Sequence, residues 1–199
     1  MTIGKGHLFV ISGPSGVGKG SLREKLFRCI PDLKYSVSVT SRKPRENEQE
    51  GKDYYFVDKD TFKKYIKENL FAEWALVYGD YKGTLMTTIQ ESISQGEDLV
   101  LEIDVQGAMQ IKEKFPDGIF IFIAPPSWEK LEHRLRNRKT EREEEVQQRL
   151  NDAHDEMKYV KYYDYLIINN HLEKALKELE SIIISERCKI RMDKLQSVI

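Results

Sequence analysis

Short apolar runs recur along the chain, and segments with helical spacing separate most of them. The runs are Leu8–Ile11, Tyr35–Val39, Tyr54–Val57, Leu99–Ile103, Ile119–Ala124 and Tyr165–Ile168. Those near residues 10, 101, 121 and 167 are almost continuously apolar, as in parallel strands that are covered on both faces. The pattern therefore predicts a central parallel sheet.

Helical spacing fills the intervals between these runs. The predicted helices cover Ser21–Cys29, Asp60–Asn69, Leu85–Gln95, Val105–Phe115, a segment capped by Ser127, an apolar stripe from Val146 to Val160, and a last helix from Leu172 toward Arg191. Gly96 and Pro116 stand where helices commonly stop. Strands that alternate with helices predict an α/β fold with right-handed crossovers.

Two regions break this alternation. Residues 35–95 are rich in Arg, Tyr, Glu and Gly, which predicts a lobe inserted into the core. Residues 134–145 are dense in charge, which is usual for a solvated face but also suits a mobile lid. We expect one domain over 1–199, with a core of about 1–34, 96–126 and 146–199, a lobe of about 35–95 and a lid of about 127–145.

Composition excludes several classes of protein. The 199 residues carry a net charge of −1, so no global field favours nucleic acid or an anionic membrane. No apolar run approaches the ~20 residues of a membrane span, and the first residues show no signal-peptide pattern. Cys29 and Cys188 lack a metal-ligand spacing and are expected to be reduced thiols. We expect a cytoplasmic protein whose four histidines are incidental or at the surface.

The segment GPSGVGKG at residues 13–20 carries the strongest chemical signal. It joins an apolar strand to a helix, which is where a glycine-rich loop wraps a phosphate chain. The glycines let backbone N–H groups turn inward, the helix N-terminus adds partial positive charge, and Lys19 adds a full charge. Gly20 departs from this pattern, because a Ser or Thr hydroxyl normally meets Mg²⁺ there and Ser21 comes one residue late.

The predicted lobe holds three donors that suit a phosphate dianion. Arg42 and Arg45 can bind phosphate with two hydrogen bonds each, and Tyr54 adds a neutral hydroxyl. On these residue types alone, solvated charges near a hairpin are about as good an explanation.

The order of residues in this segment resembles the guanylate kinase signature. Residues 40–56 match T-[ST]-R-x₂-[KR]-x₂-[DE]-x₂-G-x₂-Y-x-[FY] throughout. Further matches are FAEW at 71–74, GDYKGT at 79–84, EIDVQG at 102–107, APPS at 124–127, RL at 134–135 and YLIIN at 165–169. The resemblance covers essentially the whole chain. It implies a P-loop nucleoside monophosphate kinase fold, a stand-alone bacterial type of enzyme, and transfer of the γ-phosphoryl of ATP to GMP, and to dGMP, with Mg²⁺.

The resemblance also implies roles for individual residues. The ATP site would comprise Gly13, Pro14, Ser15, Gly16, Val17, Gly18, Lys19, Gly20, Ser21 and Asn169. The GMP site would comprise Ser38, Arg42, Arg45, Tyr54, Glu73, Lys82, Thr84 and Asp104. The residues that act on the transferring phosphoryl would be Lys19, Arg42, Arg134, Arg138 and Arg149. We expect ATP and GMP as partners, without nucleic acid, a membrane or an obligate protein partner.

The chemistry of guanine fits this assignment. Guanine presents N1–H and an exocyclic NH₂ side by side, and the carboxylate of Glu73 can accept both. Adenine has an unprotonated N1 in that place and would leave an acceptor unmet. Hydrogen-bond readout in a buried site discriminates far better than shape in an apolar pocket. Ser38 and Thr84 can donate to guanine O6.

Three positions depart from the family pattern. Lys82 stands where many members have a second tyrosine that contacts the GMP phosphate, and a solvated lysine is an equally good explanation. Glu102 takes a place often held by Asp, and Gly20 removes the usual hydroxyl. We therefore expect no direct protein ligand to Mg²⁺; phosphate oxygens and waters would hold it, with Glu102, Asp104 and Ser21 as outer-shell candidates.

Two rival functions remain open from the sequence. One is a nucleoside monophosphate kinase for another base, such as AMP, which Glu73 and the 40–57 segment count against. The other is a binding module of the kind found in scaffold proteins, which resembles this fold but usually lacks the lysine of the phosphate loop. Lys19 favours an enzyme.

Overall fold

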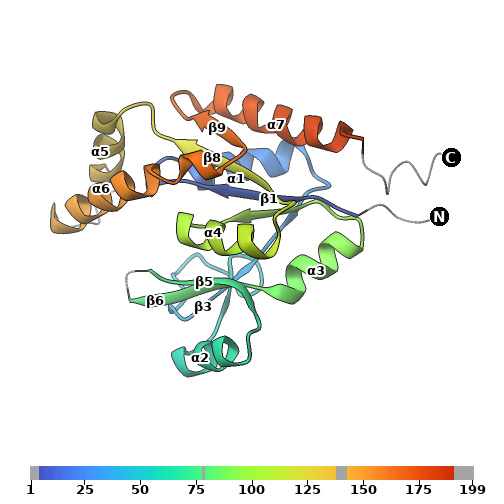
Figure 1. Ribbon diagram of the computed structural model, residues 1–199. Coiled ribbons are helices and arrows are strands. Elements are labelled where there is room, and N and C mark those ends of the chain that lie inside the picture. The colour runs from blue at the N-terminus through green and yellow to red at the C-terminus, as the bar shows by residue number, and fades with distance from the viewer. Residues whose placement is uncertain (1–4, 78, 138–142, 191–199) are drawn as a thin grey trace.

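The core of the protein is a five-stranded parallel sheet in the order β2-β7-β1-β8-β9. The computed structural model describes residues 5–77, 79–137 and 143–190 (Figure 1). The strands are β1 (Leu8–Ser12), β2 (Lys34–Tyr35), β7 (Leu99–Glu102), β8 (Ile119–Ala124) and β9 (Tyr165–Ile168). All residues of β1 and β8 are buried, as their continuous apolar sequences predict.

Helices cover both faces of this sheet. They are α1 (Lys19–Cys29), α3 (Met86–Ser94), α4 (Val105–Lys114), α5 (Trp128–Arg136), α6 (Glu143–Met157) and α7 (Leu172–Cys188), with a short 3₁₀ turn at Val160–Tyr162. Phe9 and Ile11 point to the face packed by α1, α5 and α7, whereas Val10 points to the face packed by α3 and α4. This alternation along β1 builds two apolar layers around one sheet.

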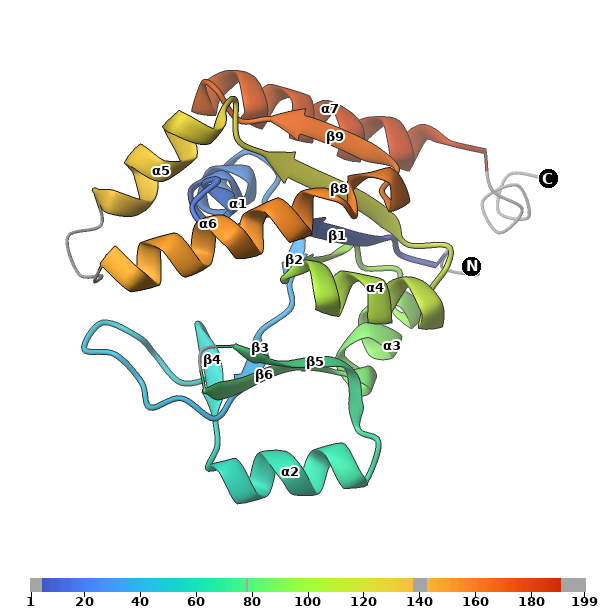
Figure 2. The ribbon, with the colours of Figure 1, turned by 60° about the vertical axis from the view of Figure 1, so that its left-hand side comes forward.

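A second, smaller sheet forms the lobe below the core (Figures 1 and 2). Its order is β4-β3-β6-β5, from β3 (Ser38–Thr40), β4 (Tyr54–Phe56), β5 (Phe71–Val77) and β6 (Asp80–Leu85). Helix α2 (Lys59–Lys67) packs on it through Phe62, whose ring lies 4.4 Å from that of Phe71 and 5.2 Å from that of Tyr81, centroid to centroid. The lobe thus has its own small aromatic core.

The lobe is where the predicted strands differ most from the structure. The predicted run Tyr35–Val39 is two strands: β2 pairs with β7 in the core, and β3 begins the lobe sheet. Strands β5 and β6 were not predicted. Aspartate, lysine and glycine in β6 have low strand propensity, but cross-strand pairing with β5 holds them.

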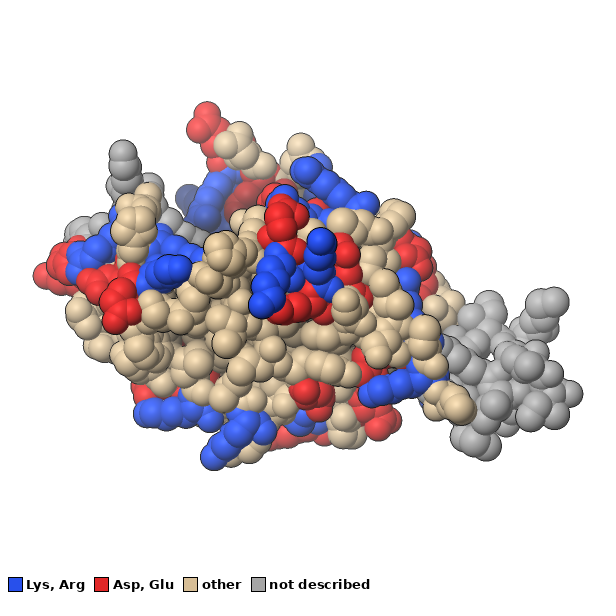
Figure 3. Space-filling view, turned by 90° about the horizontal axis from the view of Figure 1, so that it is seen from above, with Lys and Arg blue, Asp and Glu red and all other residues tan. Residues whose placement is uncertain are grey.

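The surface mixes charges of both signs, the two cysteines are free thiols as expected, and one histidine is buried. Lys and Arg mix with Asp and Glu on the face seen in Figure 3, and both cysteines are exposed free thiols. No described helix has the length and apolar character that a bilayer span needs. His7, expected to be incidental or at the surface, is only 8% exposed; its Nδ1 lies 2.7 Å from Asp98 Oδ1, and Asp98 Oδ2 pairs with Arg187 Nε. Asp98, which is distant in sequence, accepts from both the backbone N–H and the ring of His7 and makes this burial possible.

Replacement of Phe62 tests the aromatic core of the lobe. Phe62→Ala leaves a cavity under Phe71 and Tyr81 and is expected to lower the free energy of unfolding by about 3–5 kcal/mol in urea denaturation followed by circular dichroism. Tyr55→Ala, at a side chain that is 45% exposed in the same lobe, is the control and should change it by about 0.5 kcal/mol or less. Equal effects of the two substitutions would contradict this packing.

Candidate active site

The phosphate loop joins β1 to α1 at the carboxyl edge of the parallel sheet. Gly13, Gly16 and Gly18 all have positive φ. At Gly18, the N-cap of α1, φ is 94° and a Cβ would lie 2.7 Å from Asn169 Nδ2. A side chain there would face both a strained backbone and a collision, so the loop requires glycine.

Two side chains from distant elements brace this loop at one backbone carbonyl. Asn169 follows β9, is 4% exposed, and donates from Nδ2 to the Val17 oxygen at 2.7 Å. Arg134 of α5 donates to the same oxygen at 3.3 Å and to the Asn169 carbonyl at 2.9 Å. Asn169 was predicted from the sequence as an ATP contact and Arg134 as a residue that acts on the transferring phosphoryl; in the structure both hold the shape of the loop.

Lys19 lies folded over the loop. Its Nζ donates to the carbonyl oxygens of Gly13, at 2.5 Å, and Pro14, at 3.1 Å. Its charge also acts on the carboxyl group of Glu156 in α6, where burial raises the pKa to about 7 while Lys19 lowers it. Bound phosphate would therefore find a cation already positioned within the loop.

The most buried carboxyl group of the site belongs to Glu73. It lies on β5, is 3% exposed, and accepts a hydrogen bond of 2.7 Å from the hydroxyl of Thr84 on β6. A register shift between Phe71 and Glu73 re-aims the strand at this point. Glu73 Oε2 lies 2.6 Å from where a Cβ of Gly107 would be, so Gly107 on α4 leaves the room that the carboxyl group occupies.

Burial sets the proton affinity of this carboxyl group. Loss of solvent raises the pKa of Glu73 to about 7, the Thr84 hydroxyl partly offsets the rise, and the carboxylate of Asp104 adds to it. Asp104 itself caps α4, because its Oδ1 accepts the N–H of Gly107 at 2.8 Å. An ionised Glu73 would be stabilised by further donors, and a ligand with adjacent N–H groups supplies them.

The cationic cluster of the lobe is held together by an acidic residue. Arg42 donates to Glu48 Oε1 at 2.7 Å, and the backbone N–H of Arg45 donates to Glu48 Oε2 at 2.8 Å. Lys82 Nζ lies 3.5 Å from the hydroxyl of Tyr54, and both Lys82 and Arg42 lie over the Tyr54 ring, at 5.3 and 5.5 Å from its centroid. Four predicted residues thus come together on one surface.

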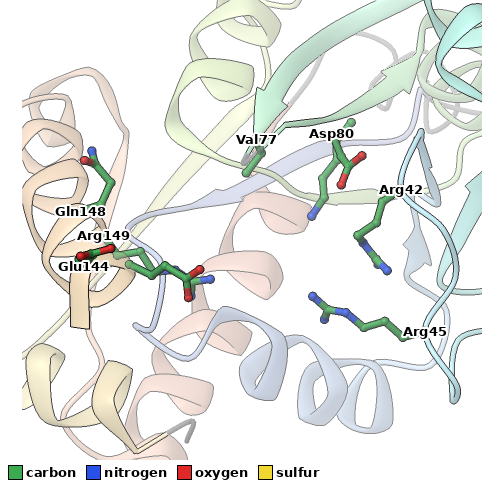
Figure 4. A pocket seen from close by; sticks show the side chains of 9 residues that line it. Arg42, Arg45, Val77, Asp80, Glu144, Gln148 and Arg149 are labelled. Atoms are coloured by element: carbon green, nitrogen blue, oxygen red, sulfur yellow. The ribbon is translucent and has the colours of Figure 1, made fainter. Parts of the chain in front are cut away.

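A cleft separates this cluster from the core. One pocket of about 470 Å³ is lined from the lobe by Arg42, Arg45, Val77, Asp80 and Lys82, and from α6 by Glu144, Glu145, Gln148 and Arg149. Figure 4 shows Arg42 and Arg45 on one side of it and Arg149 on the other. A second pocket of about 460 Å³ shares Val77, Gln148 and Arg149 and reaches Ser15 and Asp104. The two form one cleft from the lobe to the phosphate loop.

The remaining predicted residues are placed as follows. Ser38 begins β3 opposite Tyr54, and Ser21 is exposed on α1. Glu102 ends β7, the neighbour of β1 in the core sheet. Arg149 Nη1 lies 3.5 Å from the hydroxyl of Ser15. Arg138 lies outside the described residues.

Three residues of the site were not predicted from the sequence. Glu48 fills the acidic position of the 40–56 signature, which already hinted at a partner for the arginines. Gly107 lies within EIDVQG, but a close approach to Glu73 has no signal in the sequence. Glu156 of α6 stands beside Asp155 and one turn after Asp152, so the sequence indicates a solvated acidic stretch, and its partial burial depends on packing that the sequence does not reveal.

Comparisons with known proteins agree with this geometry. The family model for guanylate kinase matches residues 5–186. The guanylate kinase of Caldanaerobacter subterraneus subsp. tengcongensis is 47% identical over 96% of this chain and 92% of its own, and that of Syntrophotalea carbinolica is 48% identical over 92% and 88%. The crystal structure of guanylate kinase from Anaplasma phagocytophilum superposes with a TM-score of 0.77, at 32% identity, over 95% of this chain and 90% of that one.

The parallel sheet, the phosphate loop and the lobe across the cleft define a P-loop nucleoside monophosphate kinase, an enzyme that transfers a phosphoryl group between nucleotides. The family model and the curated relatives match most of the chain, which identifies the family within this class of kinases. The chain belongs to the guanylate kinase family.

The raised pKa of Glu73 predicts a pH dependence of stability. Folding raises the pKa of Glu73 from 4.5 to about 7, because the folded protein disfavours the charged form. The contribution of Glu73 to the free energy of unfolding is therefore fully present below pH 4.5, where the carboxyl group is protonated in both states, and it is lost as the pH rises through 7. The free energy of unfolding of the wild type, minus that of Glu73→Gln, should fall by on the order of 3 kcal/mol across this window.

Urea titrations of both proteins between pH 4 and 8 measure this difference. Glu156, whose pKa burial also raises to about 7, is present in both proteins, so its contribution cancels. A difference that stays constant with pH would show that the Glu73 carboxyl group keeps an ordinary pKa in the folded protein.

Proposed function

We propose that the chain is an ATP:GMP phosphotransferase, which transfers the γ-phosphoryl of ATP to GMP, and to dGMP, and releases ADP and GDP. The observation that carries this proposal is the buried Glu73, held by Thr84 on the lobe, across a cleft from a phosphate loop with Lys19. One half of the cleft suits a triphosphate and the other suits a base with adjacent N–H donors.

Guanine recognition would rest on Glu73 and its neighbours. The carboxylate would accept from N1–H and the exocyclic NH₂, while Ser38 and Thr84 would donate to O6, with Asp104 alongside. An unliganded Glu73 carries an unfavourable buried charge or a proton, and guanine relieves this state with two charge-assisted bonds. Adenine cannot do so, which is the basis of selectivity.

Phosphate binding on the lobe would work by exchange. Arg42 is now neutralised by Glu48, whose pKa is lowered chiefly by the hydrogen bond from Arg42. A GMP phosphate would bind Arg42, Arg45, Tyr54 and Lys82 in competition with Glu48. A phosphate held in this way would lie in the cleft that Arg149 borders on the other side.

The reaction needs alignment and neutralisation of charge rather than a protein nucleophile. An oxygen of the GMP phosphate attacks the γ-phosphorus in line, a new P–O bond forms, and the bond from the γ-phosphorus to the bridging oxygen of ADP breaks. Lys19 would leave the Gly13 and Pro14 carbonyls to bind phosphate oxygens, and Arg149 and Arg138 would stabilise the transferring group. Closure of the lobe (about 35–95) and lid (about 127–145) over the core would exclude water.

Magnesium is the metal proposed for this site. Hard oxygen ligands suit it, and the carboxylates of Glu102 and Asp104 stand at the carboxyl ends of β7 and at the start of α4, close to the loop. When bound with ATP, Mg²⁺ would neutralise phosphate charge. The cytoplasmic location and the lack of an obligate protein partner stay predictions.

A panel of acceptors tests the proposed function. ADP formation from ATP is measured with GMP, dGMP, AMP, CMP and UMP as acceptors, and GMP and dGMP should be strongly preferred. A preference for AMP would refute the assignment of the base. Absence of transfer to every acceptor would favour a binding module.

Replacement of the loop lysine tests its role in transfer. Lys19→Met should reduce kcat by about 100-fold or more, because it removes a charge that is aimed at the transferring group. Lys25→Met is the matched control on the same helix; Lys25 pairs at the surface with Glu173, and the variant should keep normal turnover. Near-normal turnover of Lys19→Met, with GMP as acceptor, would exclude this lysine from catalysis.

The base selectivity depends on the charge of Glu73. In Glu73→Gln the amide oxygen still accepts one bond, but the charge-assisted pair is lost, so the ratio of kcat/KM for GMP over AMP should fall about tenfold or more. Glu68→Gln, at an exposed carboxylate of the same lobe, should leave the ratio unchanged. Unchanged discrimination in Glu73→Gln would place guanine readout elsewhere.

A further inference from the structure

Helix α4 connects the core to the lobe through two of its faces. It packs on the core sheet through Ala108 and Ile111, and it lies between that sheet and β5 in both ribbon views (Figures 1 and 2). Gly107, Gln110 and Lys114 stand three and four positions apart, so they share a second face of the helix. All three face β5, which makes this strand the part of the lobe that the core holds most directly.

Gln110 completes the open edge of β5. This strand is the last in the order β4-β3-β6-β5, so one side of it pairs with β6 and the other is an edge. Gln110 Oε1 accepts the N–H of Trp74 at 3.2 Å, and Gln110 Nε2 donates to the Trp74 carbonyl at 2.9 Å. A residue of an antiparallel strand exchanges the same two kinds of bond with its partner. The amide of Gln110 therefore holds the backbone beside Glu73 as a neighbouring strand would.

Lys114 holds the two residues that precede Glu73. Its Nζ donates to the carbonyl of Ala72 at 2.6 Å and to that of Phe71 at 3.2 Å. The register of β5 against β6 shifts between Phe71 and Glu73, so the lysine supplies donors where the ladder is disturbed. Burial raises the pKa of Glu73 to about 7, whereas the charge of Lys114 lowers it, so this lysine also favours the ionised carboxylate.

We propose that Gln110 and Lys114 are positioning residues for base selection: they clamp the backbone on both sides of Glu73 to α4 and so set where its carboxyl group meets the base. The clamp lies at the Glu73 end of β5, whereas Val77 at the other end lines the cleft. A base bound to Glu73 must also keep its phosphate aligned with the phosphate loop, and a misplacement of about 1 Å can cost on the order of 100-fold in rate. The inference rests on the proposed use of GMP.

Nucleotide affinity tests the clamp without turnover. Calorimetry measures the Kd of GMP, of IMP, whose base has N1–H but no exocyclic NH₂, and of ADP, which reports the phosphate loop. Gln110→Met keeps the length of the side chain but removes both bonds to Trp74. GMP affinity should then fall by about tenfold, the preference for GMP over IMP should fall by about threefold or more, and ADP affinity should keep its wild-type value. Lys114→Met should change both GMP quantities in the same direction.

A matched substitution controls for the loss of a glutamine. Gln90→Met, at an exposed position of α3, should leave all three affinities unchanged. Gln110 is half-buried and Lys114 is exposed, so both clamp variants are expected to fold, which thermal unfolding checks. Should one of them not fold, the other decides the same question.

A double-mutant cycle shows whether the clamp acts through Glu73. In the Glu73→Gln background, Gln110→Met should change the preference for GMP over IMP by less than about twofold, because the carboxylate that the clamp positions is gone. A side chain that only stabilises the fold would lower the affinities for GMP, IMP and ADP alike and leave the preference intact.

Three results would overturn the proposal. A wild-type preference for GMP over IMP in the folded clamp variants would show that Glu73 is positioned without them. An equal loss of preference in the wild-type and Glu73→Gln backgrounds would show that Gln110 acts independently of Glu73. An equal loss of affinity for all three nucleotides would assign the clamp to stability alone. A wild-type protein that binds GMP no more tightly than IMP would instead refute the base assignment on which the clamp rests, so the two failures are distinguishable.

Discussion

The carbonyl oxygen of Val17 is the point on which the donor half of the site depends. A loop that turns its N–H groups toward a phosphate chain turns carbonyls outward, and an outward carbonyl in a buried place needs donors. Asn169 and Arg134 supply them from the end of β9 and from α5. Three segments that are far apart in sequence therefore fix one loop, which is why the parallel order of β1, β8 and β9 matters for chemistry as well as for the core.

The acceptor half obeys a different constraint, which is the cost of burying a carboxyl group. Glu73 accepts a side-chain hydrogen bond from Thr84, and it gains its room from the missing side chain of Gly107 on α4. The lobe and α4 are thus fitted to each other around a group that is unstable without a ligand. A base with two adjacent N–H donors would supply the hydrogen bonds that the buried carboxyl group lacks in the free protein. A base without such donors would leave the cost of burying this group in place.

The sequence predicted the structure well where a run of one residue type is compatible with few local structures. Continuous apolar runs predicted β1, β7 and β8, and the glycines with Lys19 predicted the loop, because burial on two faces and positive φ leave few alternatives. The apolar run at β9 predicted a strand, but the expected cover on both faces was wrong: β9 is at the edge of the sheet, and Leu166 and Ile168 are 52% and 54% exposed. The sequence was uninformative where a contact with another side chain or strand decides the outcome. Strand β6 exists because β5 pairs with it, His7 is buried because Asp98 receives it, and Glu48 matters because Arg42 folds onto it.

Departures from a family pattern follow the same logic. Lys82 and Gly20 each look like a loss when read along the chain, but each has a neighbour in space that changes its meaning. Lys82 lies over the Tyr54 ring beside Arg42, so the aromatic face that it lacks is present next to it and now carries two cations. Gly20 faces the carboxylate of Glu102, whose Oε1 lies 3.9 Å from where a Cβ of residue 20 would be. A substituted residue in a binding site is therefore interpretable only together with the side chain that shares its space.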